Sequence, residues 1–133
     1  MLNLSLIKNT LEQLRVEASQ QALAPVSIAV VDALGNLLYL ERWEGAPART
    51  VRIAQAKAYT ATRMQCSTQS FHQRLLRESL QLQSFMDDQL CAMPGGVLIH
   101  AASTIVGGVG VSGRAIGLDH ELAEGIAGLL VKA

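Results

Sequence analysis

The sequence has few cysteines and aromatic residues, and it has no excess of either charge. Only two cysteines, Cys66 and Cys91, occur among its 133 residues, and they form no Cys-x-x-Cys motif. This excludes a disulfide framework and a zinc-finger site, and it favours two reduced, structural thiols. Eleven basic residues balance eleven acidic ones, and no basic run stands out. This composition argues against nucleic acid as a partner.

Long hydrophobic runs are also missing. No segment approaches the roughly 20 apolar residues that a membrane span requires, and the first residues show no basic stretch followed by an apolar one. We therefore expect a cytoplasmic protein without a membrane partner. Because 50% of the residues are hydrophobic, the length and composition predict one domain over residues 1–133 with a core of its own.

Common nucleotide and hydrolase motifs are absent or out of context. Residues 108–113 satisfy the pattern G-x-G-x-x-G, but a dinucleotide site needs this pattern between a strand and a helix of a βαβ unit. Residues 114–133 leave room for one helix and no second parallel strand, so the dinucleotide reading is rejected. No G-x-S-x-G elbow is present. Asp32, at the end of a predicted strand, is interpreted as a turn former.

A strand in which glycines alternate with β-branched residues is predicted at Thr104–Gly113. Side chains of a strand point to its two faces in turn, so Val109 and Val111 share one face while Gly108 and Gly110 leave the other nearly bare. Glycine inside a strand usually marks the close approach of another element or of a ligand. We expect an alanine-faced helix to cover these glycines.

That helix is predicted over residues 50–64, with Thr50 as its N-cap. Its apolar side carries several small residues, including Ala54, Ala58 and Ala61, and Lys57 is its one charged residue. A lysine in this place either extends along its stem to solvent, forms a structural ion pair, or points into a pocket where desolvation lowers its pKa. Lys57 is therefore the best candidate for a functional side chain.

The remaining elements follow from periodicity and from turn and cap residues. Helices are predicted over residues 3–23, from Ser67 or Thr68 onward, and from an Asp119 N-cap to Lys132; strands at 26–31, 37–43 and 97–100; and a short helix or turn within 80–90. Gly35 supplies the left-handed position of a hairpin turn. Gly125 and Gly128 fall on the outer face of the last helix, where they indicate either contact with another subunit or a tolerant surface.

Several segments together resemble the GlcG/HbpS family, also called the haem-degrading domain, which forms the C-terminal half of PduO-type proteins. They are residues 25–35, 44–47, 53–58, 94–96 and 106–113, followed by Asp119 and Ala123. The resemblance implies a profilin-like α/β (α+β) fold, in which helices flank both faces of a five-stranded antiparallel sheet. It also implies homo-oligomers, from dimers to octamers.

The family resemblance further implies an accessory protein that binds a small ligand such as haem or a corrinoid. Relatives of this kind belong to glycolate, propanediol or glycerol utilisation. The expected pocket comprises Glu44, Lys57, Ser112, Gly113, Arg114 and Asp119. Arg114 or Lys57 would pair with a carboxylate of the ligand, and His100 or His120 would be the axial ligand of a haem iron.

Two alternatives use the same residues differently. A small enzyme of the lyase or isomerase type, acting on a hydroxy acid, an aldehyde or an aromatic substrate, would employ Lys57 as acid, base or electrostatic clamp. Glu44 or Asp119 would then be its partner. The other alternative is a purely structural homo-oligomer, in which the glycine face and the Gly125 and Gly128 helix serve packing and assembly.

Overall fold

The computed structural model describes residues 2–131. In this part of the chain the helices are α1 (Leu4–Ala18), α2 (Arg49–Met64), α3 (Thr68–Arg77), the 3-10 helix η1 (Leu82–Phe85) and α4 (Ile116–Leu129). The strands are β1 (Ser27–Asp32), β2 (Leu37–Arg42), β3 (Gly96–Ala101) and β4 (Thr104–Ser112). The predicted α+β class is confirmed.

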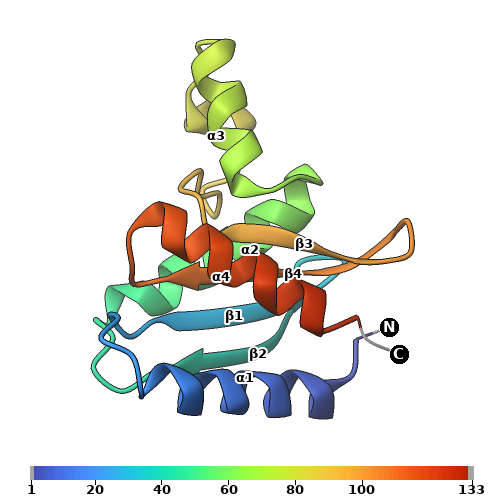
Figure 1. The fold of residues 1–133 in the computed structure, drawn as a ribbon. Helices are drawn as coiled ribbons and strands as arrows, with labels where there is room; N and C mark the ends of the chain where they lie inside the picture. The colour runs from blue at the N-terminus through green and yellow to red at the C-terminus, as the bar shows by residue number, and fades with distance from the viewer. Residues whose placement is uncertain (1, 132–133) are drawn as a thin grey trace.

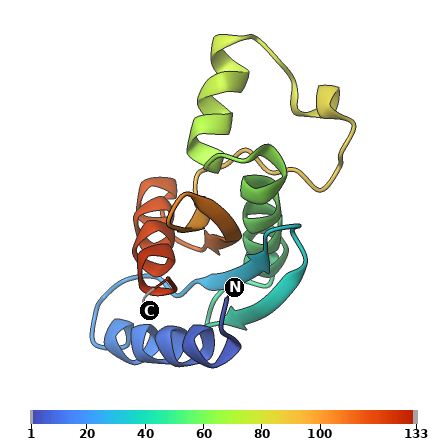
Figure 2. The same cartoon turned by 90° about the vertical axis from the view of Figure 1, so that its right-hand side faces the viewer.

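The strands form one antiparallel sheet in the order β2-β1-β4-β3. The prediction of five strands is wrong for residues 2–131, which form a four-stranded sheet. Residues 66–93, which follow α2 in the long connection between β2 and β3, contain α3 and η1 and no strand. In Figures 1 and 2, α3 projects away from the sheet.

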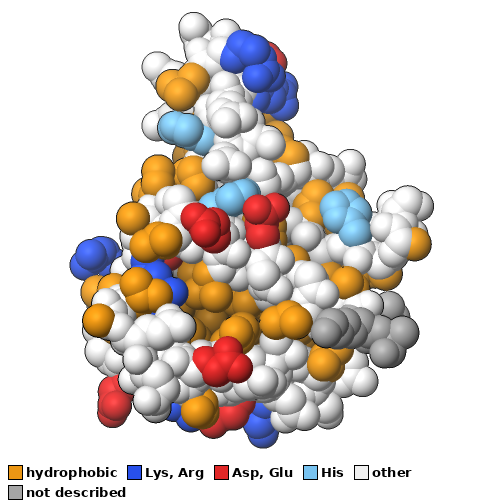
Figure 3. Space-filling model, viewed as in Figure 1, with side chains coloured by type: hydrophobic (Ala, Val, Ile, Leu, Met, Phe, Trp, Pro, Cys, Tyr) orange, Lys and Arg blue, Asp and Glu red, His pale blue; other side chains and the backbone are white. Residues whose placement is uncertain are grey.

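Helices cover both faces of the sheet, as predicted. Figure 1 shows α1 and α4 crossing its front, and Figure 2 shows α2, in green, on the opposite side. Figure 3 shows that hydrophobic side chains line a hollow between α4 and α1 on the front face. Strands β1 and β4 lie at the centre of the sheet, which agrees with the burial of Ser27–Val31 and of Gly107–Ser112.

The two faces of the central strands differ in side-chain size. Toward α1 and α4, the strands present Ile28, Val30, Val109 and Val111, which belong to the main hydrophobic core. Toward α2 they present small residues, among them Ala29, Gly108 and Gly110. A β-carbon added to Gly110 would overlap the backbone carbonyl of Ala54. The bare face of the glycine strand is therefore covered by the alanine side of α2, as predicted.

Three helix boundaries differ from the prediction. The first helix ends at Ala18 instead of residue 23, because residues 19–24 add no buried side chain to its apolar face. α2 begins one residue earlier than expected, at Arg49. Its Thr50 is no N-cap, since its buried hydroxyl faces the sheet, donates to the carbonyl of Pro47 at 2.6 Å and lies 2.8 Å from the hydroxyl of Ser27.

The last helix begins at Ile116, so the prediction that Asp119 is its N-cap is wrong. The carboxylate lies in the first turn and accepts a hydrogen bond from the backbone N–H of Arg114 at 3.0 Å. Its side chain points into the core, where its second partner is Lys57. The helix ends at Leu129, and the predicted end at Lys132 lies outside the described residues.

The hairpin between β1 and β2 confirms Asp32 as a turn former. Its carboxylate accepts backbone N–H groups of Leu34 and Asn36, both at 2.9 Å. The turn also contains Gly35 in the predicted left-handed conformation, with φ of 89°. These hydrogen bonds to the charged form hold the pKa of Asp32 below its ordinary value of 3.8.

Asp32→Ala is expected to lower the free energy of unfolding by about 1 kcal/mol, because the three hydrogen bonds that its carboxylate accepts in the turn are lost. The depressed pKa means that the folded state binds fewer protons than the unfolded state near pH 3.8. The contribution of Asp32 is therefore fully present above pH 3.8 and is lost as the pH falls from there through the lower pKa of the folded state. Urea unfolding of both proteins at pH 7 and pH 3 measures the difference, and an equal difference at both values would contradict the assignment.

Candidate ligand-binding site

Lys57 is fully buried between α2 and the end of the glycine strand, with 1% of its surface exposed. Its amino group donates to the carbonyl of Val111 at 2.8 Å and lies 3.5 Å from Oδ2 of Asp119. A β-carbon at Gly95 would approach Nζ of Lys57 to 2.7 Å. Residue 95 thus lies directly over the amino group, and only a glycine leaves space for it.

Asp119 brings the predicted turn and the lysine together. It is 2% exposed, and its other carboxylate oxygen, Oδ1, accepts the N–H of Arg114. The side chain of Arg114 turns away from the pair, since its Nε donates to the carbonyl of Ala24 at 2.7 Å and its guanidinium lies over the ring of Trp43. The backbone of the turn, and not its cationic side chain, therefore joins the Lys57 cluster.

Burial opposes both charges of this pair. Desolvation lowers the pKa of Lys57 below 10.5, although the carboxylate of Asp119 counteracts the shift. Desolvation likewise raises the pKa of Asp119 above 3.8, against the opposing effect of Lys57. A pair of this kind, joined to α2, β4 and α4, fits a structural ion pair. The predicted roles of Lys57 as acid, base or clamp stay predictions.

The other predicted site residues lie in different places. Ser112 is buried at the end of β4, and Gly113 follows it in the turn with φ of 142°. Glu44 is exposed in the loop between β2 and α2. The structure thus brings Lys57, Asp119 and the turn at 112–114 into one cluster and leaves Glu44 at the surface. Their binding of a ligand stays a prediction.

Both candidate histidines lie on the α4 side of the sheet. His100, exposed on β3, and Glu124 of α4 line a groove of about 240 Å³. Nε2 of His120 lies 3.1 Å from Oε1 of the same Glu124. Within residues 2–131, no three His, Cys, Asp or Glu side chains are grouped so that they could hold a metal ion. Gly125 and Gly128 are exposed on the same helix, and their role in assembly stays a prediction.

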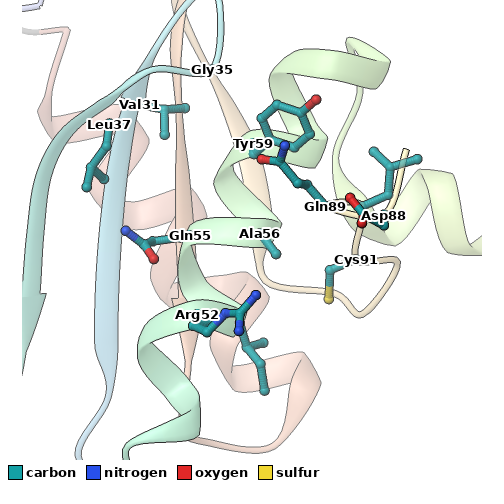
Figure 4. A pocket seen from close by; sticks show the side chains of 12 residues that line it. Val31, Gly35, Leu37, Arg52, Gln55, Ala56, Tyr59, Asp88, Gln89 and Cys91 are labelled. Atoms are coloured by element: carbon teal, nitrogen blue, oxygen red, sulfur yellow. The ribbon is translucent and has the colours of Figure 1, made fainter. Parts of the chain in front are cut away.

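A larger cleft lies on the outer face of α2 and has a volume of about 500 Å³. Figure 4 shows that α2 forms its floor, while the β1–β2 hairpin and the segment at 88–91 stand on either side. Its lining comprises Val31, Gly35, Leu37, Arg52, Ile53, Gln55, Ala56, Tyr59, Asp88, Gln89, Leu90 and Cys91. None of the predicted site residues is among them.

The wall at 88–91 is fastened to α2 by three polar contacts. The hydroxyl of Tyr59 donates to Asp87 at 2.5 Å, and Nε of Arg63 lies 3.6 Å from the same carboxylate. The N–H of Cys91 donates to the hydroxyl of Thr60 at 2.8 Å. These contacts fix the wall at 88–91 relative to α2.

Arg52, Gln55 and Tyr59 lie on the face of α2 that is turned away from the sheet. The sequence does not identify them as a site, because the walls of the cleft come from segments far away in the chain. One local signal was available. Ala56 is an apolar residue within this polar face, and Ile53 lies beside it at the edge of the apolar side.

Comparison with known proteins identifies related sequences along almost the whole chain. A family model described as "Haem degrading protein HbpS-like" matches residues 2–127. The chain is 27% identical over 111 residues to the corrinoid adenosyltransferase PduO of Salmonella typhimurium. This match covers 82% of the chain but 33% of the Salmonella protein, so the chain spans about a third of the length of that relative.

Solved structures show the same fold. A variant of HbpS from Streptomyces reticuli is 30% identical, with a TM-score of 0.82, and the match covers 97% of this chain and 86% of that one. A structure described as a PduOC:heme complex is 25% identical, with a TM-score of 0.79 and coverage of 92% and 91% of the two chains. Among residues 2–131, no helix is both long and apolar enough to span a membrane.

Proposed function

Because the chain belongs to the HbpS-like family of haem degrading proteins, we propose that it binds a tetrapyrrole, and that the ring lies in the cleft over α2. The observation that carries this proposal is the cleft itself, a preformed cavity of about 500 Å³. Ligand sites in proteins commonly have volumes of roughly 300–1,000 Å³ with apolar walls and a few polar groups. The heme complex of a relative with the same fold supports the choice of ligand class.

The side chains of the cleft fit such a ring. Val31, Leu37, Ile53 and Leu90 supply apolar surface from three separate segments, and Arg52 supplies a cation for a carboxylate. Cys91 and Tyr59 are of the types that hold haem iron in proteins. The hydroxyl of Tyr59 already donates a hydrogen bond to Asp87. The thiol of Cys91 is therefore the better candidate for an iron ligand.

A bound haem would supply an iron centre whose axial ligand and surroundings set its reactivity. The residues of this chain would hold the ring against α2, keep water from its apolar face and orient its carboxylates. An accessory role in glycolate, propanediol or glycerol utilisation, with the protein acting as a homo-oligomer, completes the proposal.

Ala56→Trp is expected to weaken haemin binding by at least about tenfold, because the indole would fill the floor of the cleft. Titration of the purified protein with haemin, followed at the Soret band, measures the affinity. Val16→Trp provides a matched control, since Val16 is half exposed on α1, on the opposite face of the sheet. Its affinity is expected to equal that of the unchanged protein.

The alkylation rates of the two cysteines test the position of the bound ring independently of the titration. Cys91 lines the cleft and Cys66 does not, and both are free thiols. Bound haemin is expected to slow alkylation of Cys91 relative to Cys66, as measured by peptide mass spectrometry. Loss of the Soret shift in His100→Ala or His120→Ala, with binding unaffected in Ala56→Trp, would instead place the ring at the α4 groove and overturn the cleft assignment.

A further inference from the structure

The cleft over α2 carries one positive and one negative side chain. Its one basic lining residue is Arg52, and its one acidic lining residue is Asp88. Figure 4 shows Arg52 on the exposed face of α2 and Asp88 across the cleft on the wall at 88–91, beside Gln89. The pKa of the Tyr59 hydroxyl is raised by its hydrogen bond to Asp87 and also by the nearby charge of Asp88, whereas Arg52 lies about two helical turns away from Tyr59. Residues 52 and 59 are seven positions apart, which corresponds to about 10 Å along a helix. The two charges therefore face different ends of any ligand that covers this face.

The guanidinium of Arg52 is free to pair with a ligand, whereas that of Arg63 on the same helix is not. Within residues 2–131, Arg63 already pairs with Asp87, whereas Arg52 forms no ion pair or hydrogen bond with another side chain. The first turn of α2 contains no acidic residue that would compete for its guanidinium. A carboxylate at this end of the cleft would therefore be the first anionic partner of Arg52.

We propose that the cleft binds its tetrapyrrole in one orientation, with carboxylates at Arg52 and an uncharged edge beside Asp88. This inference rests on the proposed function and deepens it, because it names the class of ring. A porphyrin of the haem type carries its two carboxylates on one edge and apolar groups on the others, which matches this charge pattern. A corrinoid ring carries neutral amides around its rim and gains nothing from Arg52.

Asp88 reinforces the orientation by repulsion. A carboxylate placed at its end of the cleft would meet a like charge, which disfavours the reversed ring. Both Arg52 and Asp88 are exposed in the free protein, so their influence is screened by salt. The discrimination is accordingly expected to be larger at low than at high ionic strength.

The test compares haemin with haemin dimethyl ester, in which both carboxylates are masked, under identical buffer and detergent conditions. Arg52→Met is expected to weaken haemin binding by about tenfold and to leave binding of the ester unchanged. Arg49→Met is the matched control, since Arg49 opens the same helix but does not line the cleft. Thermal unfolding of each variant verifies that it folds.

Dicyanocobinamide serves as the amide-bearing ring, and its binding is expected to be weaker than that of haemin and indifferent to Arg52→Met. Equal affinity of haemin and its ester for the unchanged protein would overturn the orientation while leaving tetrapyrrole binding intact. A loss in Arg52→Met that is the same for both ligands would overturn it as well. Absence of saturable binding for every ring would overturn the proposed function and the orientation with it.

Discussion

Gly110→Ala is expected to destabilise the protein by about 3 to 5 kcal/mol, enough to unfold a domain of ordinary stability in part. An added β-carbon at this position would overlap the carbonyl of Ala54 and approach the N–H nitrogen of Ala58 to 2.6 Å. Both obstacles are backbone atoms of α2, which cannot move aside as a flexible side chain would. The helix must therefore separate from the sheet. Urea unfolding followed by circular dichroism measures the loss.

Gly117→Ala is the matched control for this substitution. Gly117 lies in the first turn of α4, and a β-carbon added there would meet no atom within 4 Å. Alanine favours a helix over glycine by up to about 1 kcal/mol, so this variant is expected to be as stable as the unchanged protein or slightly more stable. A Gly110→Ala protein with unchanged stability would show that α2 does not rest on the glycine face.

The contact between α2 and β4 is the part of the fold that the sequence predicted best. The reason is that both partners carry a strong local signal: glycines at alternate positions of a strand, and alanines such as Ala54 and Ala58 on one side of a helix. Each signal is incomplete by itself, since small residues leave a surface that another element must cover. The two surfaces fit only each other, so their pairing could be inferred without coordinates.

The sequence predicted less well those polar residues that can either cap a helix or contact a buried partner. Thr50 and Asp119 both belong to the residue types that cap helices, but each lies within its helix and faces a buried partner. Thr50 contacts Ser27 on β1, and Asp119 contacts Lys57 on α2. Cap preference is a local property, and it gives way when a distant side chain offers a partner in the core.

The cleft could not be predicted, because it is a property of three segments at once. Its floor comes from α2, one side from Val31 and Leu37, and the other from residues 88–91. The last segment belongs to the stretch at 66–93, which contains α3 and η1 and for which the sequence predicted only a helix from Ser67 or Thr68 onward and a short helix or turn within 80–90. Without the course of that segment, Arg52 and Tyr59 look like ordinary solvent-facing residues.

Lys57 lies between these two cases. Its place on the apolar side of α2 was predicted, and its burial confirms it. Its partner came from an element more than sixty residues away in the chain, which local pattern does not specify. Of the uses considered for it, the geometry fits the ion pair, because the amino group is enclosed by Gly95, Val111 and Asp119.

Lys57→Met is expected to destabilise the protein by about 3 to 5 kcal/mol, since it leaves the carboxylate of Asp119 buried without its cation. The methionine fills most of the space of the lysine stem, so the loss reports charge and hydrogen bonding more than volume. The double variant Lys57→Met/Asp119→Asn removes both charges, while the amide oxygen can still accept the N–H of Arg114. It is expected to recover most of the loss, as measured by urea unfolding at pH 7.

Asp119→Asn alone tests the same pair from the other side, through its pH dependence. Burial already lowers the pKa of Lys57 below 10.5, and removal of the carboxylate lowers it further. The folded state then binds fewer protons than the unfolded state at pH values below 10.5, so the free energy of unfolding rises with pH through this window and falls as the pH drops. The slope is expected to be steeper than in the unchanged protein. A slope equal to that of the unchanged protein, together with a stable Lys57→Met variant, would show that Lys57 and Asp119 do not depend on each other.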